Sequence, residues 1–467
     1  MSSILDLAPE LLELVLSFLS PKDLICFALT CRHVSGFVQP DNQILWKASF
    51  LQVFDHPKHA WASLVPTARA ENQSREAEWD WYHELQRRFI AFNAVCKSDQ
   101  TALLTGVEDV VRTLLDVEET ASCKDKDEDG NARSLNVIFL EQLTRERQAE
   151  EPREPRIFKI VHDYDYQRDS ESRSLPLEHL IDSDRRVTRS MLARRVAVPE
   201  WASKFHIIHG PTEREQESSR AKAAARAIVY DWNVTGPPAD FGPFKKDLSG
   251  AVDWQNVEAI SSLMHRIIAT ALKMYKLAPT GFSINIPRAL PLNVASPEDW
   301  AGATGTWLGT YAFLDYRALV HYNFAHDQEY PLDLGNYEEA CGDLMRLELK
   351  IEDSEELKRD PRLQTELPRC KDLPVLFFKG FSHNESSGRP SIAIRGFASL
   401  VPGGRSVRWR FIIRYAGTDQ WQLEGVQPGG VRSGPIYGLW SHVDRDEQGP
   451  MGPFYYAPAE LCQRTQE

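Results

Sequence analysis

The 467-residue sequence lacks the features of several large classes of protein. Its most apolar stretch near the start, residues 11–19, is too short to span a bilayer and is interrupted by Glu13 and Ser17. No signal-peptide pattern precedes that stretch. The seven cysteines have scattered spacings and form no Cys-x-x-Cys pair, which is typical of free thiols in a reducing compartment. We therefore expect a protein of the cytoplasm, the nucleus or both, without a membrane partner.

An excess of positive charge is also missing. The chain has 54 Lys and Arg residues against 67 Asp and Glu residues, which gives a formal net charge of −13. Proteins that grip the nucleic-acid backbone neutralise phosphates with clustered Lys and Arg side chains. We therefore expect no nucleic-acid partner.

Motifs of known chemistry are absent as well. The sequence has no His-Glu-x-x-His, no Gly-x-Ser-x-Gly and no P-loop, and no period of 20–50 residues recurs. His206 and His209 lie three residues apart, but no set of carboxylate or cysteine ligands lies near them in sequence, and Gly210-Pro211 indicates a turn. The glycine-rich residues 426–434 precede another predicted strand, so they indicate a turn. We expect no catalytic residue, no metal and no cofactor in this chain.

What the chain does contain begins with a compact helical unit near its start. The first helix carries a stripe of apolar residues at three- and four-residue spacing: Leu11, Leu12, Val15, Leu16 and Leu19. Leu14 and Phe18 fall outside that stripe, so this helix is apolar around most of its circumference. A surface helix needs only one apolar face, so the second face must be covered by another surface.

The middle of the chain alternates helices with polar segments. Further helices are predicted from apolar periodicity and capping residues at 75–96, 212–232 and 253–277. We expect a basic mobile loop near 166–196, and we read residues 156–166 as a strand. Residues 51–100 are interpreted as a helical linker that docks the first unit onto the remainder.

After residue 300 the sequence becomes rich in aromatic and β-branched residues. At least six short runs of near-alternating polarity are separated by Gly, Pro, Asp and Asn, and Pro402-Gly403-Gly404 marks a hairpin turn. The fold class is therefore α+β: a trihelical unit over 1–50, the linker, and a large antiparallel β-rich domain over 101–467 with inserted and flanking helices. A closed barrel is favoured because closure removes exposed strand edges.

Residues 5–46 resemble an F-box in the order and spacing of their motif residues. The resemblance rests on the opening Leu7-Ala8-Pro9-Glu10-Leu11-Leu12, the Val15, Leu16 and Leu19 segment, the Pro21, Asp23 and Leu24 start of the second helix, Cys31-Arg32, and Leu45-Trp46. Two positions depart from the family pattern: alanine stands at residue 8 where leucine is usual, and valine stands at residue 34 where tryptophan is common.

The resemblance implies a partner for the second apolar face of the first helix. F-box helices insert beside the helices of a Skp-type adaptor, which connects to a cullin and a RING ubiquitin ligase. The resemblance places the following residues in or near the adaptor interface: Pro9, Leu11, Leu12, Val15, Leu16, Leu24 and Leu29. It implies that the chain is the substrate-recognition subunit of an SCF-type E3 ubiquitin ligase. The alternative is a plain helical core with no partner.

Segments between residues 230 and 456 are similar to segments of fungal F-box proteins, and residues 305–311 resemble the barrel of animal F-box-only receptors. Under this reading the β-rich domain binds a protein substrate. The residues expected to contact that substrate are Trp307, Arg414, Trp421, Arg432 and Tyr437. The simpler interpretation is that the aromatic residues fill the barrel and that Arg408 and Arg410 lie on its charged outer face.

Two other functions remain open from the sequence. Gly305-Thr306-Trp307 resembles the Gly-x-Trp of ligand-binding barrels, so the barrel could be a small-molecule sensor tethered to an F-box. A barrel interior filled with side chains would argue against that function. A hydrolase or transferase fused to an F-box would require a nucleophile and base pair, and none is evident in the sequence.

Overall fold

The computed structural model describes residues 4, 7–96, 100–122, 134–145, 199–211, 218–279, 298–324, 333–383, 392–431 and 433–464. The predicted basic loop, the predicted strand over 156–166 and Arg432 lie outside these residues. The chain divides into two compact units. Unit 1 contains Met1–Ser63 and Arg69–Ile160, and unit 2 contains Leu64–Ala68 and Val161–Glu467.

Unit 1 is helical in the residues that the structure describes. Proline opens several of its helices at positions where the missing N–H costs no hydrogen bond. At the start of the second helix, the Ser20 hydroxyl also accepts a hydrogen bond from the Asp23 amide at 3.2 Å, as a capping residue does. The helices are α1 (Pro9–Leu16), α2 (Pro21–Ala28), α3 (Arg32–Phe37), α4 (Gln43–Leu51), α5 (Pro57–Ala62), α6 (Pro66–Ala77), α7 (Trp81–Cys96), α8 (Gln100–Glu119) and α9 (Leu135–Arg145).

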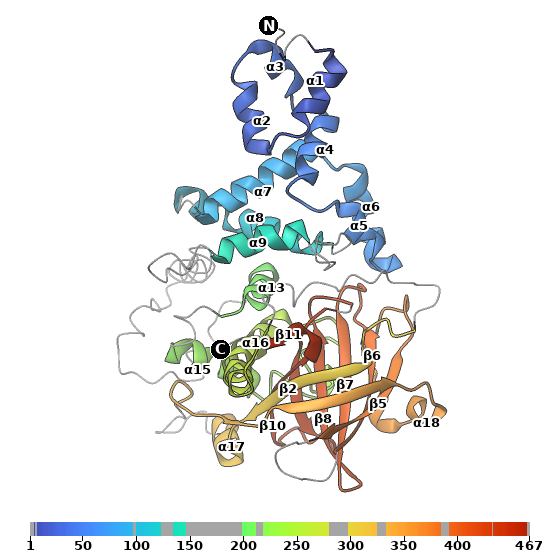
Figure 1. Ribbon diagram of the computed structural model, residues 1–467. Coiled ribbons are helices and arrows are strands. Elements are labelled where there is room, and N and C mark those ends of the chain that lie inside the picture. The colour runs from blue at the N-terminus through green and yellow to red at the C-terminus, as the bar shows by residue number, and fades with distance from the viewer. Residues whose placement is uncertain are drawn as a thin grey trace. The chain divides into compact units, whose positions relative to one another are not determined.

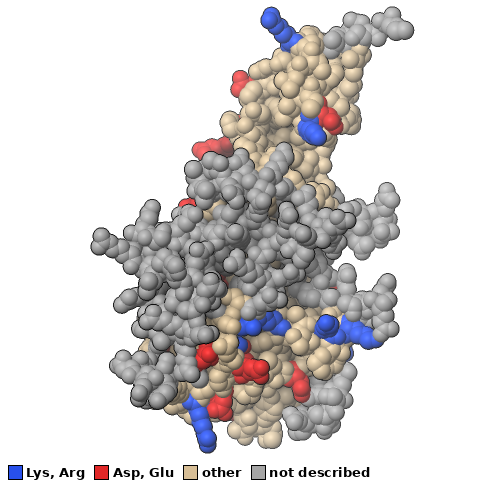
Figure 2. All heavy atoms as spheres, turned by 90° about the vertical axis from the view of Figure 1, so that its left-hand side faces the viewer, with Lys and Arg blue, Asp and Glu red and all other residues tan. Residues whose placement is uncertain are grey.

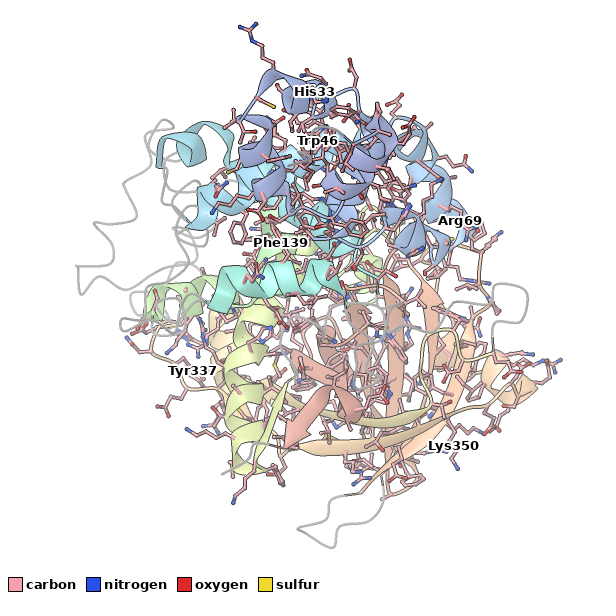
Figure 3. All side chains as sticks on the ribbon, turned by 45° about the horizontal axis from the view of Figure 1, so that its top comes forward. His33, Trp46, Arg69, Phe139, Tyr337 and Lys350 are labelled. Carbon is pink, nitrogen blue, oxygen red and sulfur yellow. The ribbon has the colours of Figure 1, made fainter. Side chains whose placement is uncertain are left out.

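The core of unit 1 is built around aromatic rings and one buried arginine. Phe54 contacts Phe139 of α9, with 4.7 Å between ring centroids; Figure 3 labels Phe139 and Trp46 within this unit. The Arg88 guanidinium of α7 is fully buried and lies over the rings of Phe50 and Phe54, at 4.8 and 4.7 Å. Burial lowers the pKa of Arg88 to about 10, because the charged form has lost its water.

The division into units differs from the sequence interpretation at Leu64–Ala68, which belongs to unit 2 and not to the linker, and again after residue 100. That interpretation assigned every residue from 101 onward to the β-rich domain, whereas α8 and α9 belong to unit 1. The reason is local. The Asp55 carboxylate accepts hydrogen bonds from the Ser122 and Leu135 amides at 2.9 and 2.8 Å, and the Arg88 guanidinium donates to Thr120 at the end of α8.

Unit 2 contains a closed antiparallel β-barrel, as the sequence predicts, and the barrel has eight strands (Figure 1). Consecutive strands pair with one another, and the last pairs with the first: Phe454 of β10 lies opposite Tyr311 of β2. The hairpin turn at Gly403 and Gly404 is also confirmed, and both residues have the positive φ that favours glycine. The barrel strands are β2 (Gly305–Phe313), β4 (Met345–Ile351), β5 (Leu376–His383), β6 (Ile392–Leu400), β7 (Val407–Tyr415), β8 (Thr418–Gln427), β9 (Ile436–His442) and β10 (Met451–Pro458).

Large aromatic rings pack over glycines on neighbouring strands inside the barrel. A Cβ atom added at Gly396 would lie 2.5 Å from the Phe378 ring, and one added at Gly438 would lie 2.5 Å from the Phe454 ring. Trp307 and Trp409, both almost fully buried, meet edge to face with 5.2 Å between centroids. The missing side chains of the glycines make room for these rings, so the interior is a packed core.

A helical layer covers the outside of the barrel along β9, β10 and β2 (Figure 1). Its main element is α16 (Trp254–Met274), which confirms the helix predicted over 253–277. The Asp253 side chain caps α16 by accepting from the Asn256 amide at 3.2 Å. The predicted helix over 212–232 corresponds to α15 (Ser219–Val229), which packs against α16. The remaining elements of unit 2 are α13 (Glu200–His209), α17 (Tyr316–Phe324), α18 (Glu355–Lys358), β1 (Leu277–Pro279), β3 (Ala340–Cys341), β11 (Cys462–Arg464) and the 3₁₀ turns η3 (Pro237–Ala239), η5 (Pro361–Leu363) and η6 (Ala459–Leu461).

A buried ion network holds residues 240 and 365 against the outer face of β7 and β8. Arg408 donates to Glu424 at 3.0 Å and to Asp240 at 2.7 Å, and Arg410 pairs with the same two carboxylates. Thr365 also donates to Asp240. The two arginines do face outward from the barrel, as expected, but their guanidinium groups are buried and paired.

We predict that Gly396→Ala lowers the free energy of unfolding of the barrel by about 2–3 kcal/mol, because overpacking forces shifts in a filled core. The new Cβ would lie 2.1 Å from the Arg410 carbonyl oxygen, which is backbone and cannot move independently of the strand. Urea unfolding followed by tryptophan fluorescence measures this loss. Ala393→Ser is the control, since it adds one atom at an exposed position of the same strand. Equal stability of both variants would contradict the packed interior.

We predict that Asp240→Asn destabilises unit 2 by about 3–5 kcal/mol at neutral pH, because it breaks a buried ion pair from one side. Burial alone would raise the pKa of Asp240, but Arg410 and Arg408 outweigh burial and hold that pKa below its ordinary value. The stabilisation is therefore present above the ordinary carboxyl pKa and is lost as the pH falls through the lowered one.

Urea unfolding measured from neutral to acid pH should show a shallower acid dependence in Asp240→Asn than in the wild type. Glu348→Gln is the matched control, because Glu348 is half exposed and 3.8 Å from Arg346. An equal loss of stability in the two variants would show that the Asp240 network does not stabilise unit 2.

Candidate functional site

The second apolar face predicted for the first helix is exposed in the structure. Leu11, Leu14 and Phe18 are 52%, 54% and 76% exposed. Leu11, Leu14 and Val15 share one face of α1, and Phe18 lies in the turn that follows the helix. The α2 helix has its own exposed pair, Ile25 and Leu29, four residues apart. Large apolar side chains exposed in this pattern mark a surface that binds a partner.

The structure divides the predicted adaptor residues into two groups. Pro9, Leu11, Val15 and Leu29 are exposed and are therefore available to a partner. Leu12, Leu16 and Leu24 are fully buried in the core of unit 1. Because buried side chains cannot reach a partner without unfolding, these three leucines support the helices from within.

The sequence reasoning did not include Leu14, Phe18 and Ile25 among the adaptor residues. The signal was present, since Leu14 and Phe18 are the two residues that fall outside the first stripe of α1. Two apolar stripes on one helix cannot be assigned to core and surface by their spacing alone. The assignment follows from the packing of α1, which buries Leu12 and Leu16.

The predicted substrate residues do not form one cluster. Trp307 is buried inside the barrel, where its indole N–H donates to the Ala303 carbonyl at 3.1 Å. Tyr437 is buried on the opposite side of the barrel wall, beneath α16, with its hydroxyl 3.0 Å from His265 Nε2. Burial raises the pKa of the Tyr437 hydroxyl, so it stays protonated at neutral pH. Trp307 therefore fills the barrel, as the simpler interpretation states, whereas Tyr437 is buried outside the barrel wall, between that wall and α16.

Arg414 and Trp421 lie close together at one end of the barrel. Ile413, the neighbour of Arg414, pairs with Trp421, and a β-bulge separates Ile413 from Arg414. Arg414 is 51% exposed and 3.4 Å from Asp419, whose carboxylate accepts two hydrogen bonds from Arg395 at 2.7 Å. The hydrogen bonds from Arg395 are the main cause of the lowered pKa of Asp419, so the Asp419 carboxylate stays charged beside Arg395 and Arg414.

An aromatic cluster extends inward from this end of the barrel. Trp421 meets Trp440 edge to face with 5.1 Å between centroids, and Trp440 in turn meets Tyr311 and Phe313 at 6.1 and 6.4 Å. Trp421, Tyr311 and Phe313 are only partly buried. This end of the barrel, with Arg414 beside it, therefore offers apolar area and charge to a partner.

The charges on the outside of the molecule are mixed. Both basic and acidic side chains occur on the face shown in Figure 2. Elsewhere, Lys379 of β5 pairs with Glu352 at 2.7 Å. Lys350 lies on the outer surface of the barrel (Figure 3). Among the described residues, no group of three His, Cys, Asp or Glu side chains is placed to bind a metal, and none of the described helices has the length and apolarity to cross a bilayer.

Comparison with known families agrees with the geometry of α1–α3. The family model of the F-box domain matches residues 4–39. No curated protein and no solved structure matched the chain. Residues 4–39 are therefore an F-box domain, and they precede in sequence a unit built on a closed eight-stranded barrel.

We predict that Leu16→Ala lowers the free energy of unfolding of unit 1 by about 2–5 kcal/mol, because it leaves a cavity in the core. By contrast, Leu14→Ala should change it by less than about 0.5 kcal/mol, since Leu14 is exposed. Hydrogen exchange of the α4 amides under increasing urea measures both values. An equal loss of unfolding free energy in the two variants would contradict the assignment of Leu16 to the core and Leu14 to the surface.

Proposed function

We propose that this chain is the substrate receptor of an SCF-type ubiquitin ligase. The observation that supports it is the exposed apolar stripe of α1 within the matched F-box domain, since F-box domains generally bind Skp-type adaptors in cullin-RING ligases. The adaptor would cover Leu11, Leu14 and Phe18, together with Leu29 of α2. Burial of apolar surface is worth about 25 cal/mol per Å², so a stripe of this kind is a strong docking element.

The second part of the proposal concerns the β-rich unit. We assign substrate binding to the barrel end that carries Arg414 and Trp421, because exposed charge and partly exposed aromatic rings occur together there. The ubiquitin-transfer chemistry would belong to partner subunits. The receptor would then act by raising the effective concentration of a substrate lysine near the charged conjugating enzyme.

The small-molecule sensor is the less favoured function. Rings of Trp307, Trp409, Phe378 and Phe454 occupy the barrel interior, and those of Phe378 and Phe454 pack closely against glycines. A ligand in that position would have to displace them. The filled interior therefore favours a receptor for proteins over a carrier of small ligands.

The proposal is tested by co-purification of the full-length chain with a Skp-type adaptor and a cullin. We predict that Leu11→Asp with Leu14→Asp abolishes the stoichiometric complex while the chain stays folded, because both positions are exposed in the free chain. Ile90→Asp is the matched control: Ile90 is 55% exposed, as apolar as the leucines, and lies on α7 outside the matched domain.

The outcomes separate clearly. A complex with the wild type and with Ile90→Asp, but not with the double variant, supports the receptor. If the wild type stays folded and binds no adaptor, the proposed function is wrong. If the double variant still binds, the α1 stripe is not the docking surface.

A further inference from the structure

A five-residue segment, Leu64–Ala68, precedes the barrel by a long stretch of sequence and contributes two residues to its core. Val65 and Ala68 are buried to 1% and 0% exposure in the same cluster as Trp300, Trp409 and the other interior side chains of the barrel. Leu64 packs against that cluster. The chain crosses from unit 1 into unit 2 at Leu64 and returns to unit 1 at Arg69.

The contacts of this segment are specific. The Thr67 amide donates to the Asp372 carboxylate at 2.6 Å, and the Cys370 thiol lies 3.6 Å from the Thr67 hydroxyl. Val65 fits against the β6–β7 hairpin so closely that a Cβ atom at Gly404 would lie 2.6 Å from its methyl group. Gly404 thus serves two purposes, since it also adopts the positive φ of the turn.

The segment helps to fill the end of the barrel that carries the β6–β7 hairpin. Trp300 is fully buried there, with its indole N–H donating to the Pro374 carbonyl at 2.8 Å. Trp300, Val65 and Ala68 lie outside the barrel strands but belong to the same buried cluster as the inward side chains of those strands. Val65 and Ala68 supply the apolar atoms that complete the core.

We propose that Leu64–Ala68 is a built-in plug of the barrel, so that the stability of the β-rich unit depends on residues of the α5–α6 connection. The inference is independent of the receptor function. Removal of the plug's apolar contacts would expose one end of the core and loosen the strands nearest to it, β6 and β7. Unit 1, which has its own core, would keep its stability.

The test uses hydrogen exchange with mass spectrometry on the full-length chain. Two alanines on α6 provide a matched pair: Ala68 is fully buried in the barrel core, and Ala70 is exposed. Ala68→Asp should speed exchange of the β6–β7 amides about tenfold or more, because an unpaired carboxylate is excluded from an apolar core. Ala70→Asp should change it less than about twofold, and neither should alter α7.

A milder variant keeps the test decisive if Ala68→Asp does not fold. Val65→Ala removes two methyl groups from the plug and should speed β6–β7 exchange by about fivefold, again without an effect on α7. The proposal is overturned if Val65→Ala leaves β6–β7 exchange unchanged, or if a soluble Ala68→Asp behaves like Ala70→Asp. Binding of the Skp-type adaptor, measured in parallel, fails or succeeds independently of these rates.

Discussion

Closure of the barrel by the pairing of β10 with β2 is the constraint on which unit 2 depends. Once the eighth strand lies against the first, every inward side chain must share a fixed volume, and the sequence meets this limit by setting aromatic rings over glycines. Phe454 lies over Gly438, and Phe378 lies over Gly396. The same closure fixes the outer wall, so that α16 has a continuous surface to cover and Tyr437 is buried from outside.

The outer face of β7 and β8 carries two buried arginines, Arg408 and Arg410, whose charges must be compensated. Two arginines on one strand repel each other, and burial takes their water away, yet Asp240 and Glu424 compensate both charges. Phe397 lies under both guanidinium groups, at 5.5 and 5.4 Å, and adds cation–π contact. A buried network of this kind favours one arrangement of the loop at residue 240 over all others, because any displacement leaves a charge without a partner.

Much of this architecture follows from local sequence patterns. The F-box order, the helix Trp254–Met274 and the Gly403-Gly404 hairpin rest on spacing, capping and turn chemistry that act over a few residues. What local patterns could not supply are contacts between distant positions. Arg408 meets Asp240, and Val65 enters the barrel core, because of tertiary packing. Trp307 lies inside the barrel, whereas the burial of Tyr437 depends on α16, a helix that the strand pattern does not contain.

The β10–β2 pairing also determines when the barrel can form during synthesis. The first strand, Gly305–Phe313, leaves the ribosome long before Met451–Pro458, and at about 5–20 residues per second the delay is on the order of ten seconds. Throughout that interval one edge of β2 has no strand to pair with, and unpaired edges recruit other chains. A chain that ended before Met451 would lack β10, so the edge of β2 that β10 covers would stay unpaired and the barrel could not close in this way.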